Sequence, residues 1–287
     1  MGHFLKKLFH LSFLVYYRLE YIIIAYLSFF ILKFKGTNFI NRTKNRPDIS
    51  HLKKKLEKNH TKRLAIFVAF HSKTKIPESN LNYINILNKC SFTTVYIING
   101  KVSNEVLEKL NILGCYVICR ENIGQDFGAW KDGIALLKKY KIINDLRWLL
   151  LCNDSNFCLG GSNSNHFIER FSEELNSSGA ADFISLNCNY ESRLHYQSYF
   201  LCLSNSIIQK KSFSSFWEKY IPLNHRFHAI KSGEKKFTTK ILNKFRPKIM
   251  YTSHELSENI ISNVENDYHS LLKNLPKSLF FLEAVFD

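Results

Sequence analysis

The sequence predicts an α/β fold in which helices flank a mainly parallel sheet, and two observations support this. Between residues 64 and 152, four short apolar runs alternate with segments of helical periodicity, and the connections are short. Such alternation is typical of parallel strands joined by right-handed crossovers. Of the 287 residues, 45% are hydrophobic and 24 are Phe, which excludes a disordered chain and suffices for a substantial core.

The first half of the predicted domain follows this alternation element by element. The apolar runs that we expect to form strands are 64–70, 93–98, 114–119 and 148–152. Helical periodicity begins after the first three strands, at Pro77, at Ser103 as a candidate N-cap, and at about residue 127.

The order of elements changes beyond residue 160. The expected strands are 182–188, 196–204 and 247–251. The expected helices are 164–176, 206–219, 234–245 and 265–274, with a loop over 221–233.

The N-terminal segment predicts a hydrophobic or amphipathic helix. Its uninterrupted apolar run, 21–32, is shorter than the roughly 20 residues that span a bilayer, and basic residues flank both ends. We expect residues 1–36 to lie on the inner leaflet of the cytoplasmic membrane, 37–62 to form a basic linker and 63–287 to form the domain. A helix packed on protein and a transmembrane anchor remain the alternatives.

The positive charge is concentrated in the same N-terminal region. Residues 1–63 hold fourteen Lys/Arg and three Asp/Glu, or +11 of the total +16. This distribution argues against nucleic-acid binding by the folded part. The seven cysteines include no CxxC pair, so we expect reduced thiols and a cytoplasmic protein.

A glycine-punctuated turn at 120–133 is the strongest candidate site. It joins an apolar strand to a helix, which is where α/β proteins bind ligands. Arg120, Asn122, Gly124 and Asp126 offer donors, acceptors and close backbone approach. The alternative is an ordinary connection in which Asp126 caps the helix.

Two further polar segments follow predicted strands. Asn153, Asp154 and Ser155 close the fourth strand, where one carboxylate could hold a divalent cation through oxygen ligands, or simply stabilise a turn. His71 follows the first strand, where a nucleotide base or ribose could rest.

Later in the chain, His195, Gln197 and Ser198 could line a sugar pocket, or belong to an exposed edge strand. Ser232-Gly233-Glu234 predicts a helix start with Ser232 as the cap. Glu234 would then either favour the helix dipole or act as a general base.

Three blocks resemble the rhamnan synthesis protein F family. Residues 118–133, ICRENIGQDFGAWKDG, resemble its hallmark, LLLCNDSNF at 149–157 its second block, and HYQSYFLCLS at 195–204 its third. The pair Phe216-Trp217 also fits. The resemblance implies a GT-A-like, Rossmann-type glycosyltransferase domain of bacterial cell-surface polysaccharide or lipopolysaccharide synthesis.

The resemblance also implies roles for individual residues. Asp154 would be the metal ligand, for Mn²⁺ or Mg²⁺, although Asn153-Asp154-Ser155 is not a two-acid motif. The first block would contact the nucleotide sugar through Arg120, Asn122, Gly124, Asp126 and Trp130. Glu234 would remove the proton from the acceptor hydroxyl.

The resulting hypothesis is a glycosyltransferase that moves a sugar, for example rhamnose, from a nucleotide-sugar donor to a glycan or lipid-linked acceptor. The alternative is a non-catalytic module that binds glycan or a synthase at the membrane.

Overall fold

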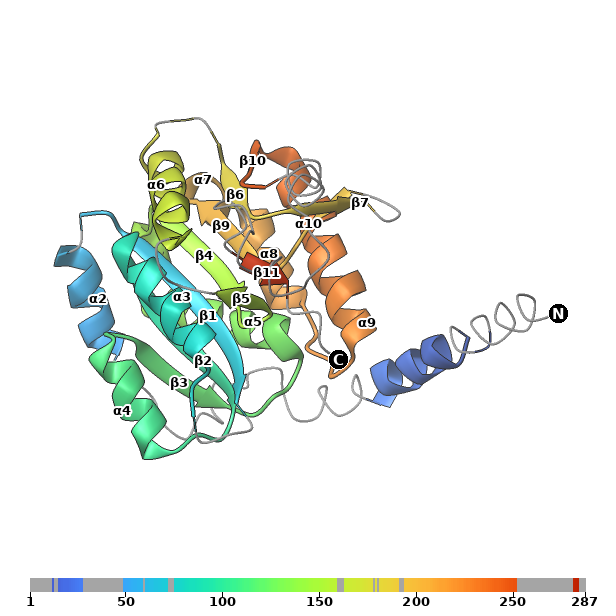
Figure 1. Cartoon of the computed structure of the whole chain (residues 1–287). Coiled ribbons are helices and arrows are strands. Elements are labelled where there is room, and N and C mark those ends of the chain that lie inside the picture. Colours follow the sequence, from blue (N-terminus) through green and yellow to red (C-terminus); the bar gives the residue numbers. More distant parts are fainter. Residues whose placement is uncertain are drawn as a thin grey trace, which may run out of the picture.

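A seven-stranded sheet forms the centre of the molecule (Figure 1). The computed structural model describes residues 12, 15–27, 49–58, 60–71, 75–158, 163–177, 179, 181–190, 194–251 and 281–283. The expected helix 265–274 lies outside these residues.

The strand order in this sheet is β10-β6-β9-β4-β1-β2-β3. The strands, in chain order, are β1 Arg63–His71, β2 Phe92–Gly100, β3 Tyr116–Arg120, β4 Trp148–Asn153, β6 Phe183–Ser185, β9 Phe200–Ser204 and β10 Pro247–Ile249. Neighbouring strands are parallel except β9, which runs antiparallel to both β4 and β6. The predicted mainly parallel α/β sheet is therefore confirmed.

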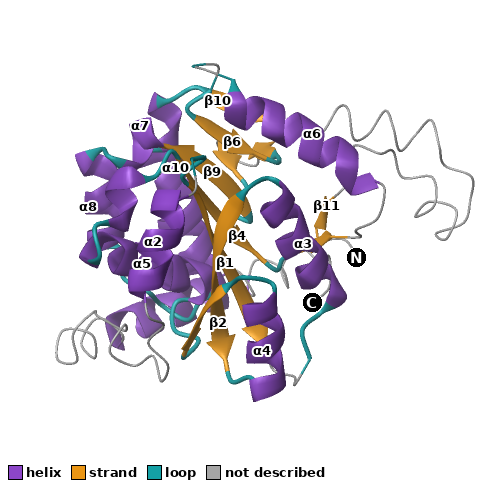
Figure 2. Ribbon diagram, turned by 90° about the vertical axis from the view of Figure 1, so that its left-hand side faces the viewer, coloured by secondary structure: helices purple, strands orange, loops and turns teal. Residues whose placement is uncertain are grey.

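Helices cover both faces of the sheet, and this explains its continuous apolar strands. On β1, Ile66 and Val68 belong to one hydrophobic cluster, while Phe67 and Ala69 belong to the other. One face carries α3 Glu78–Lys89, α4 Asn104–Ile112 and α6 Asn163–Asn176 (Figure 2). The opposite face carries α2 Ile49–Lys58, α5 Gln125–Lys139, α8 Lys211–Lys219 and α10 Lys236–Lys240.

The second half of the chain departs most from the prediction. The expected helix 206–219 is divided into α7 Asn205–Ile208 and α8, because Lys210 between them has an extended backbone. The expected strand 182–188 is divided into β6 and β7 Cys188–Tyr190, which pairs with β8 Leu194–Tyr196. Shorter elements complete the chain: the 3₁₀ helix η2 Ile142–Asp145, and β5 Asn156–Cys158 paired with β11 Phe281–Glu283.

The expected loop 221–233 is wrong over most of its length. It contains α9 Arg226–His228 and the π-helix η3 Ala229–Lys235, which continues directly into α10. The 3₁₀ helix η4 Leu242–Lys244 follows. Ser232 therefore does not cap a helix start, and Glu234 lies within a helix rather than in its first turn.

Two helices precede the sheet in the part of the chain that the structure describes. Residues 15–27 are helical, and the hydroxyl of Tyr21 lies 3.1 Å from Nδ1 of His228. Helix α2 lies within the expected linker but packs on the domain, since Leu52 and Leu56 are buried in its core. Within the described ranges, no helix is both long and apolar enough to cross a bilayer.

Candidate active site

The carboxyl edge of the parallel strands gathers most of the predicted polar residues. Asn153, at the end of β4, is in register with Val68 of β1, and Asn99 of β2 is in register with Arg120 of β3. Strand β9 begins at the same edge, because its first residue, Phe200, pairs with Cys152. The segments that follow β3 and β4 and the segment that precedes β9 therefore meet at one edge of the sheet, a usual ligand site in α/β folds.

Asn153 connects β4 to helix α5. Its Nδ2 atom donates a hydrogen bond to Oδ2 of Asp126 at 2.6 Å, and its Oδ1 accepts one from the backbone N–H of Ser155 at 3.1 Å. Oδ2 of Asp154 accepts a hydrogen bond from the backbone N–H of Phe70 at 3.0 Å. The turn expected here is thus closed by the side chain of Asn153, and Asp154 is held over the end of β1.

Two carboxyl groups interact at this position, although the sequence motif offered only one. Burial raises the pKa of Asp126 to about 7, and the negative charge of Asp154 acts in the same direction. Burial also raises the pKa of Asp154 to about 6. A carboxyl group whose pKa is raised by burial and by a neighbouring carboxylate can hold a proton near neutral pH, or its charge can be neutralised by a cation.

A divalent cation at this position would have few protein ligands. In the described part of the chain, no group of three or more His, Cys, Asp or Glu side chains could hold a metal. Mg²⁺ typically binds through one or two carboxylates and completes its shell with substrate phosphates and water. Asp126 and Asp154 would be the two carboxylate ligands of such a cation, at the carboxyl edge of the sheet.

The buried side chain of Arg120 holds the turn between β3 and α5 in place through several hydrogen bonds. Its side chain is 2% exposed, and its Nε atom lies 2.8 Å from Oδ2 of Asp132. Nη1 donates to Oδ1 of Asn99, and Nη2 donates to the carbonyl of Ile123 at 2.8 Å. These contacts favour a role in positioning the turn over the expected direct contact with a donor.

Gly124 is required by the geometry of this turn. Its φ is 77°, in the left-handed region, and a Cβ atom on it would lie 2.2 Å from Cβ of Pro222. Its N–H donates to Oδ1 of Asn224. Gly124 itself is the N-cap of α5, so the alternative in which Asp126 caps the helix is wrong.

Trp130, within α5, and Asn122, in the loop before it, differ in whether a ligand can reach their side chains. Trp130 is fully buried, and its indole N–H donates to the carbonyl of Cys152 at 3.3 Å. It therefore supports β4 from the core, which contradicts the expected contact with a donor. Asn122, in the loop before the helix, is exposed.

Glu234 and His195 form a second buried polar group. Nε2 of His195 lies 3.4 Å from Oε1 of Glu234, and these side chains are 4% and 10% exposed. Oε2 of Glu234 accepts a hydrogen bond from the backbone N–H of Ser198 at 2.8 Å. Gly233 allows this helix to approach α5, because a Cβ there would lie 2.8 Å from the ring of Phe127.

The short turn at Ser198 and Tyr199 connects the Glu234–His195 group to Asn153, which holds Asp126. The N–H of Ser198 binds Glu234, while the carbonyl of the next residue, Tyr199, accepts from the N–H of Asn153 at 3.4 Å. The structure thus brings His195, Ser198 and Glu234 to the same edge as the Asp126–Asp154 pair. The alternative of an exposed edge strand does not hold for His195, which is 3% exposed.

Three predicted residues lie at the margin of this site. His71 is the last residue of β1, and its side chain lies outside the described part. Gln197 is half-buried, and its N–H donates to the carbonyl of Asn187 at 3.3 Å. Ser155 is exposed.

Two supporting residues were not among the sequence-based candidates. Asn99 is 2% exposed and binds Arg120, and Asn224 binds the N–H of Gly124. The sequence could have identified Asn99, because it is a polar residue at the end of an apolar strand. It could not have identified Asn224, because that residue lies 100 residues after its partner.

Comparisons with known proteins identify a family and one related sequence. The model of the family "Rhamnan synthesis protein F" matches residues 94–275. The uncharacterized protein y4gN of Sinorhizobium fredii is 25% identical over 186 residues, which cover 61% of this chain and 44% of that protein.

Solved structures of the glycosyltransferase GlyE of Streptococcus pneumoniae are also similar. One has a TM-score of 0.44 at 11% identity, and its apo form has 0.41 at 12%. Each match covers 78% of this chain and 55% of the GlyE chain. The chain thus spans about half the length of the proteins that it matches.

Proposed function

Because the chain belongs to the rhamnan synthesis protein F family, we propose that it is a glycosyltransferase that extends a cell-surface glycan. The donor would be a nucleotide sugar, and a rhamnose donor is the first to test. The observation that carries this proposal is the pair Asp126–Asp154 at the carboxyl edge of the sheet, beside the N-terminus of α5.

The donor diphosphate would lie at the N-terminus of α5. Backbone N–H groups and the helix dipole favour an anion there. A divalent cation, Mn²⁺ or Mg²⁺, bound by Asp126 and Asp154 would neutralise the charge that develops on the leaving diphosphate. Asn153 would hold Asp126 in place for this role through its 2.6 Å hydrogen bond.

Glu234 is the proposed general base. It would take the proton from the acceptor hydroxyl while the hydroxyl oxygen bonds to the anomeric carbon and the bond from that carbon to the diphosphate breaks. The hydrogen bond from Ser198 and the contact with His195 fix the orientation of its carboxylate. His195 is therefore proposed as a positioning residue for the base.

The acceptor is proposed to be a glycan or lipid-linked glycan at the inner face of the cytoplasmic membrane. The helix 15–27 supports this localisation, because it exposes large apolar side chains, including Leu19, Ile22, Ile23 and Tyr26. An interfacial helix of this kind would keep the enzyme beside its acceptor.

Calorimetry with a panel of nucleotide diphosphate sugars tests this function, with and without Mn²⁺. We expect one donor to bind, Asp154→Ala to weaken its binding, and radiolabelled sugar to be transferred to membrane-extracted acceptor. Absence of donor binding under all conditions would contradict the proposal and favour a non-catalytic glycan- or synthase-binding module.

A further inference from the structure

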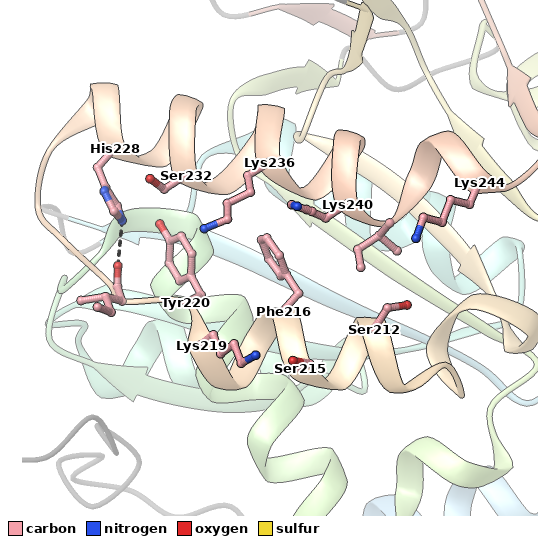
Figure 3. A pocket seen from close by; sticks show the side chains of 12 residues that line it. Ser212, Ser215, Phe216, Lys219, Tyr220, His228, Ser232, Lys236, Lys240 and Lys244 are labelled. Carbon is pink, nitrogen blue, oxygen red and sulfur yellow. Dashed lines mark hydrogen bonds between the residues drawn. The ribbon is translucent and has the colours of Figure 1, made fainter.

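A groove lined by lysines lies between α8 and the continuous helix formed by α9, η3 and α10 (Figure 3). Its volume is about 450 Å³. Lys236, Lys240 and Lys244 extend toward it from one side, and Lys219 extends toward it from α8. Among the residues that the structure describes, none that lines the groove is acidic, so this lining is positively charged.

Residue spacing explains why the basic side chains share one wall. Ser232, Lys236, Lys240 and Lys244 recur every four residues, which places them in one row along the helical segment 229–244. On α8, Ser212, Ser215 and Lys219 are three and four residues apart and form the opposite wall. The serine hydroxyls add hydrogen-bond donors beside the ammonium groups, a combination that suits phosphate oxygens.

The groove is separate from the candidate active site. Glu234 and Thr238 of the same helical segment contact Ser198 and Tyr196, toward the sheet. Ser232, Lys236 and Lys240 instead line the groove against α8. An anion bound by these lysines would therefore not occupy the place of the reacting sugar beside Glu234.

One end of the groove contacts the N-terminal helix. His228 lines the groove, and its Nδ1 lies 3.1 Å from the hydroxyl of Tyr21. The rings of Tyr17 and His225 pack with their centroids 4.6 Å apart. On the same helix, the exposed apolar residues recur at spacings of three and four, as in Val15, Leu19, Ile22 and Tyr26.

We propose that the lysine groove binds the phosphate headgroups of anionic phospholipids at the membrane surface that receives the apolar side chains of helix 15–27. The apolar stripe on that helix favours a nonpolar partner, and the lysines that line the groove favour an anionic one. A bilayer with anionic headgroups satisfies both preferences in one surface. This inference rests on the proposed membrane association, but it does not depend on glycosyl transfer.

Vesicle flotation of the full chain tests this inference. The vesicles contain either phosphatidylcholine alone or phosphatidylcholine with 30% phosphatidylglycerol. The test variant carries Lys236→Gln, Lys240→Gln and Lys244→Gln. The matched control carries Lys75→Gln, Lys89→Gln and Lys101→Gln, which are also exposed lysines but lie outside the groove.

We expect the groove variant to lose about a hundredfold in affinity for the anionic vesicles, since a lysine near such a surface contributes about fivefold. The control variant should lose no more than a few fold. An equal loss in both variants would overturn the inference, because general charge would then explain binding. Failure of the wild-type chain to float would overturn the membrane association as well.

Calorimetry with soluble inorganic pyrophosphate and nucleotide diphosphates distinguishes another source of phosphate. If the groove variant floats like the wild type but loses binding of these soluble anions, the groove serves a soluble ligand and the lipid inference is wrong. Circular dichroism of each variant confirms that it is folded, which is expected because all six lysines are exposed.

Discussion

Nε2 of His195 lies 3.4 Å from Oε1 of Glu234, and both side chains are almost entirely buried. The contact joins His195, which precedes β9, to Glu234, which lies near the end of the π-helix η3. π-helical turns are rare and occur frequently at functional sites. Only the folded structure brings these residues together, and it gives Glu234 two fixed partners, His195 and the N–H of Ser198.

Glu234→Gln should greatly slow transfer without weakening donor binding. Glutamine can still accept the hydrogen bond from Ser198 but cannot take a proton, so we expect kcat to fall about 10²–10⁴-fold. Radiolabelled transfer and calorimetry measure the two effects. The control is Glu218→Gln on α8, which removes an exposed carboxylate and should leave kcat unchanged. Wild-type kcat in Glu234→Gln would exclude Glu234 as the base.

Asp126→Asn should change how stability depends on pH. The pKa of Asp126 is raised from 3.8 to about 7 in the folded protein, so the folded state holds a proton that the unfolded state has lost. Asp126 therefore makes the wild type less stable as pH rises from about 4 to 7, and the penalty is complete above pH 7. The variant should gain stability relative to the wild type across this window.

Thermal denaturation between pH 4 and pH 9 measures this gain, with Asp145→Asn, at an exposed carboxylate, as the control. The variant should also bind the donor more weakly, because it lacks one of the two proposed cation ligands. A difference in melting temperature that is the same at every pH would contradict the raised pKa.

The hydrophobic pattern of the sequence was sufficient to predict the sheet. It was not sufficient to predict how side chains interact at the carboxyl edge of that sheet. The apolar runs that became β1, β2, β3 and β4 are bounded by polar turns, so hydrophobicity alone identified them. Their parallel arrangement placed the segments near Asp126 and Asp154 at one edge. It could not show that these two carboxyl groups interact, because that depends on the Asn153 hydrogen bond and on the Gly124 turn.

Glu234 was selected as a candidate from the sequence on the basis of a wrong prediction of its local structure. Ser232 and Gly233 have low helix propensity and suggested a helix start. Tertiary packing overrides that preference, since Gly233 is placed against the ring of Phe127 and the helix continues through it. Trp130 shows the opposite error, because its place in a distinctive block suggested a ligand contact, whereas its burial makes it part of the core.

Gly124→Ala should destabilise the protein and disrupt donor binding. A φ of 77° costs an L-residue about 1–2 kcal/mol, and the new Cβ would also clash with Pro222 at 2.2 Å. We therefore expect a loss of more than about 2 kcal/mol in the free energy of unfolding. Gly179→Ala is a matched control, since its φ is 84° but no atom lies within 4 Å of the added methyl group.

Urea denaturation of both glycine variants measures how much stability is lost to backbone strain and how much to the clash with Pro222. Gly179→Ala should lose only about 1–2 kcal/mol, from backbone strain alone. Equal losses in the two variants would mean that Pro222 can move away, and the turn would then be less rigid than its contacts indicate.

Arg120→Gln should be among the most destabilising single substitutions at this edge. The change leaves Asp132 buried without its 2.8 Å cationic partner, and removing one member of a buried ion pair costs about 3–5 kcal/mol. The control is Lys138→Gln, which breaks the ion pair with the largely exposed Glu218 and should cost less than about 1 kcal/mol.

The double variant Arg120→Gln/Asp132→Asn distinguishes a structural role of Arg120 from donor binding. With both charges removed, an amide pair can replace the ion pair, so part of the lost stability should return in urea denaturation. If Arg120 only positions the turn, donor affinity measured by calorimetry should recover together with stability. Recovered stability with donor affinity still lost would show instead that the guanidinium contacts the donor directly.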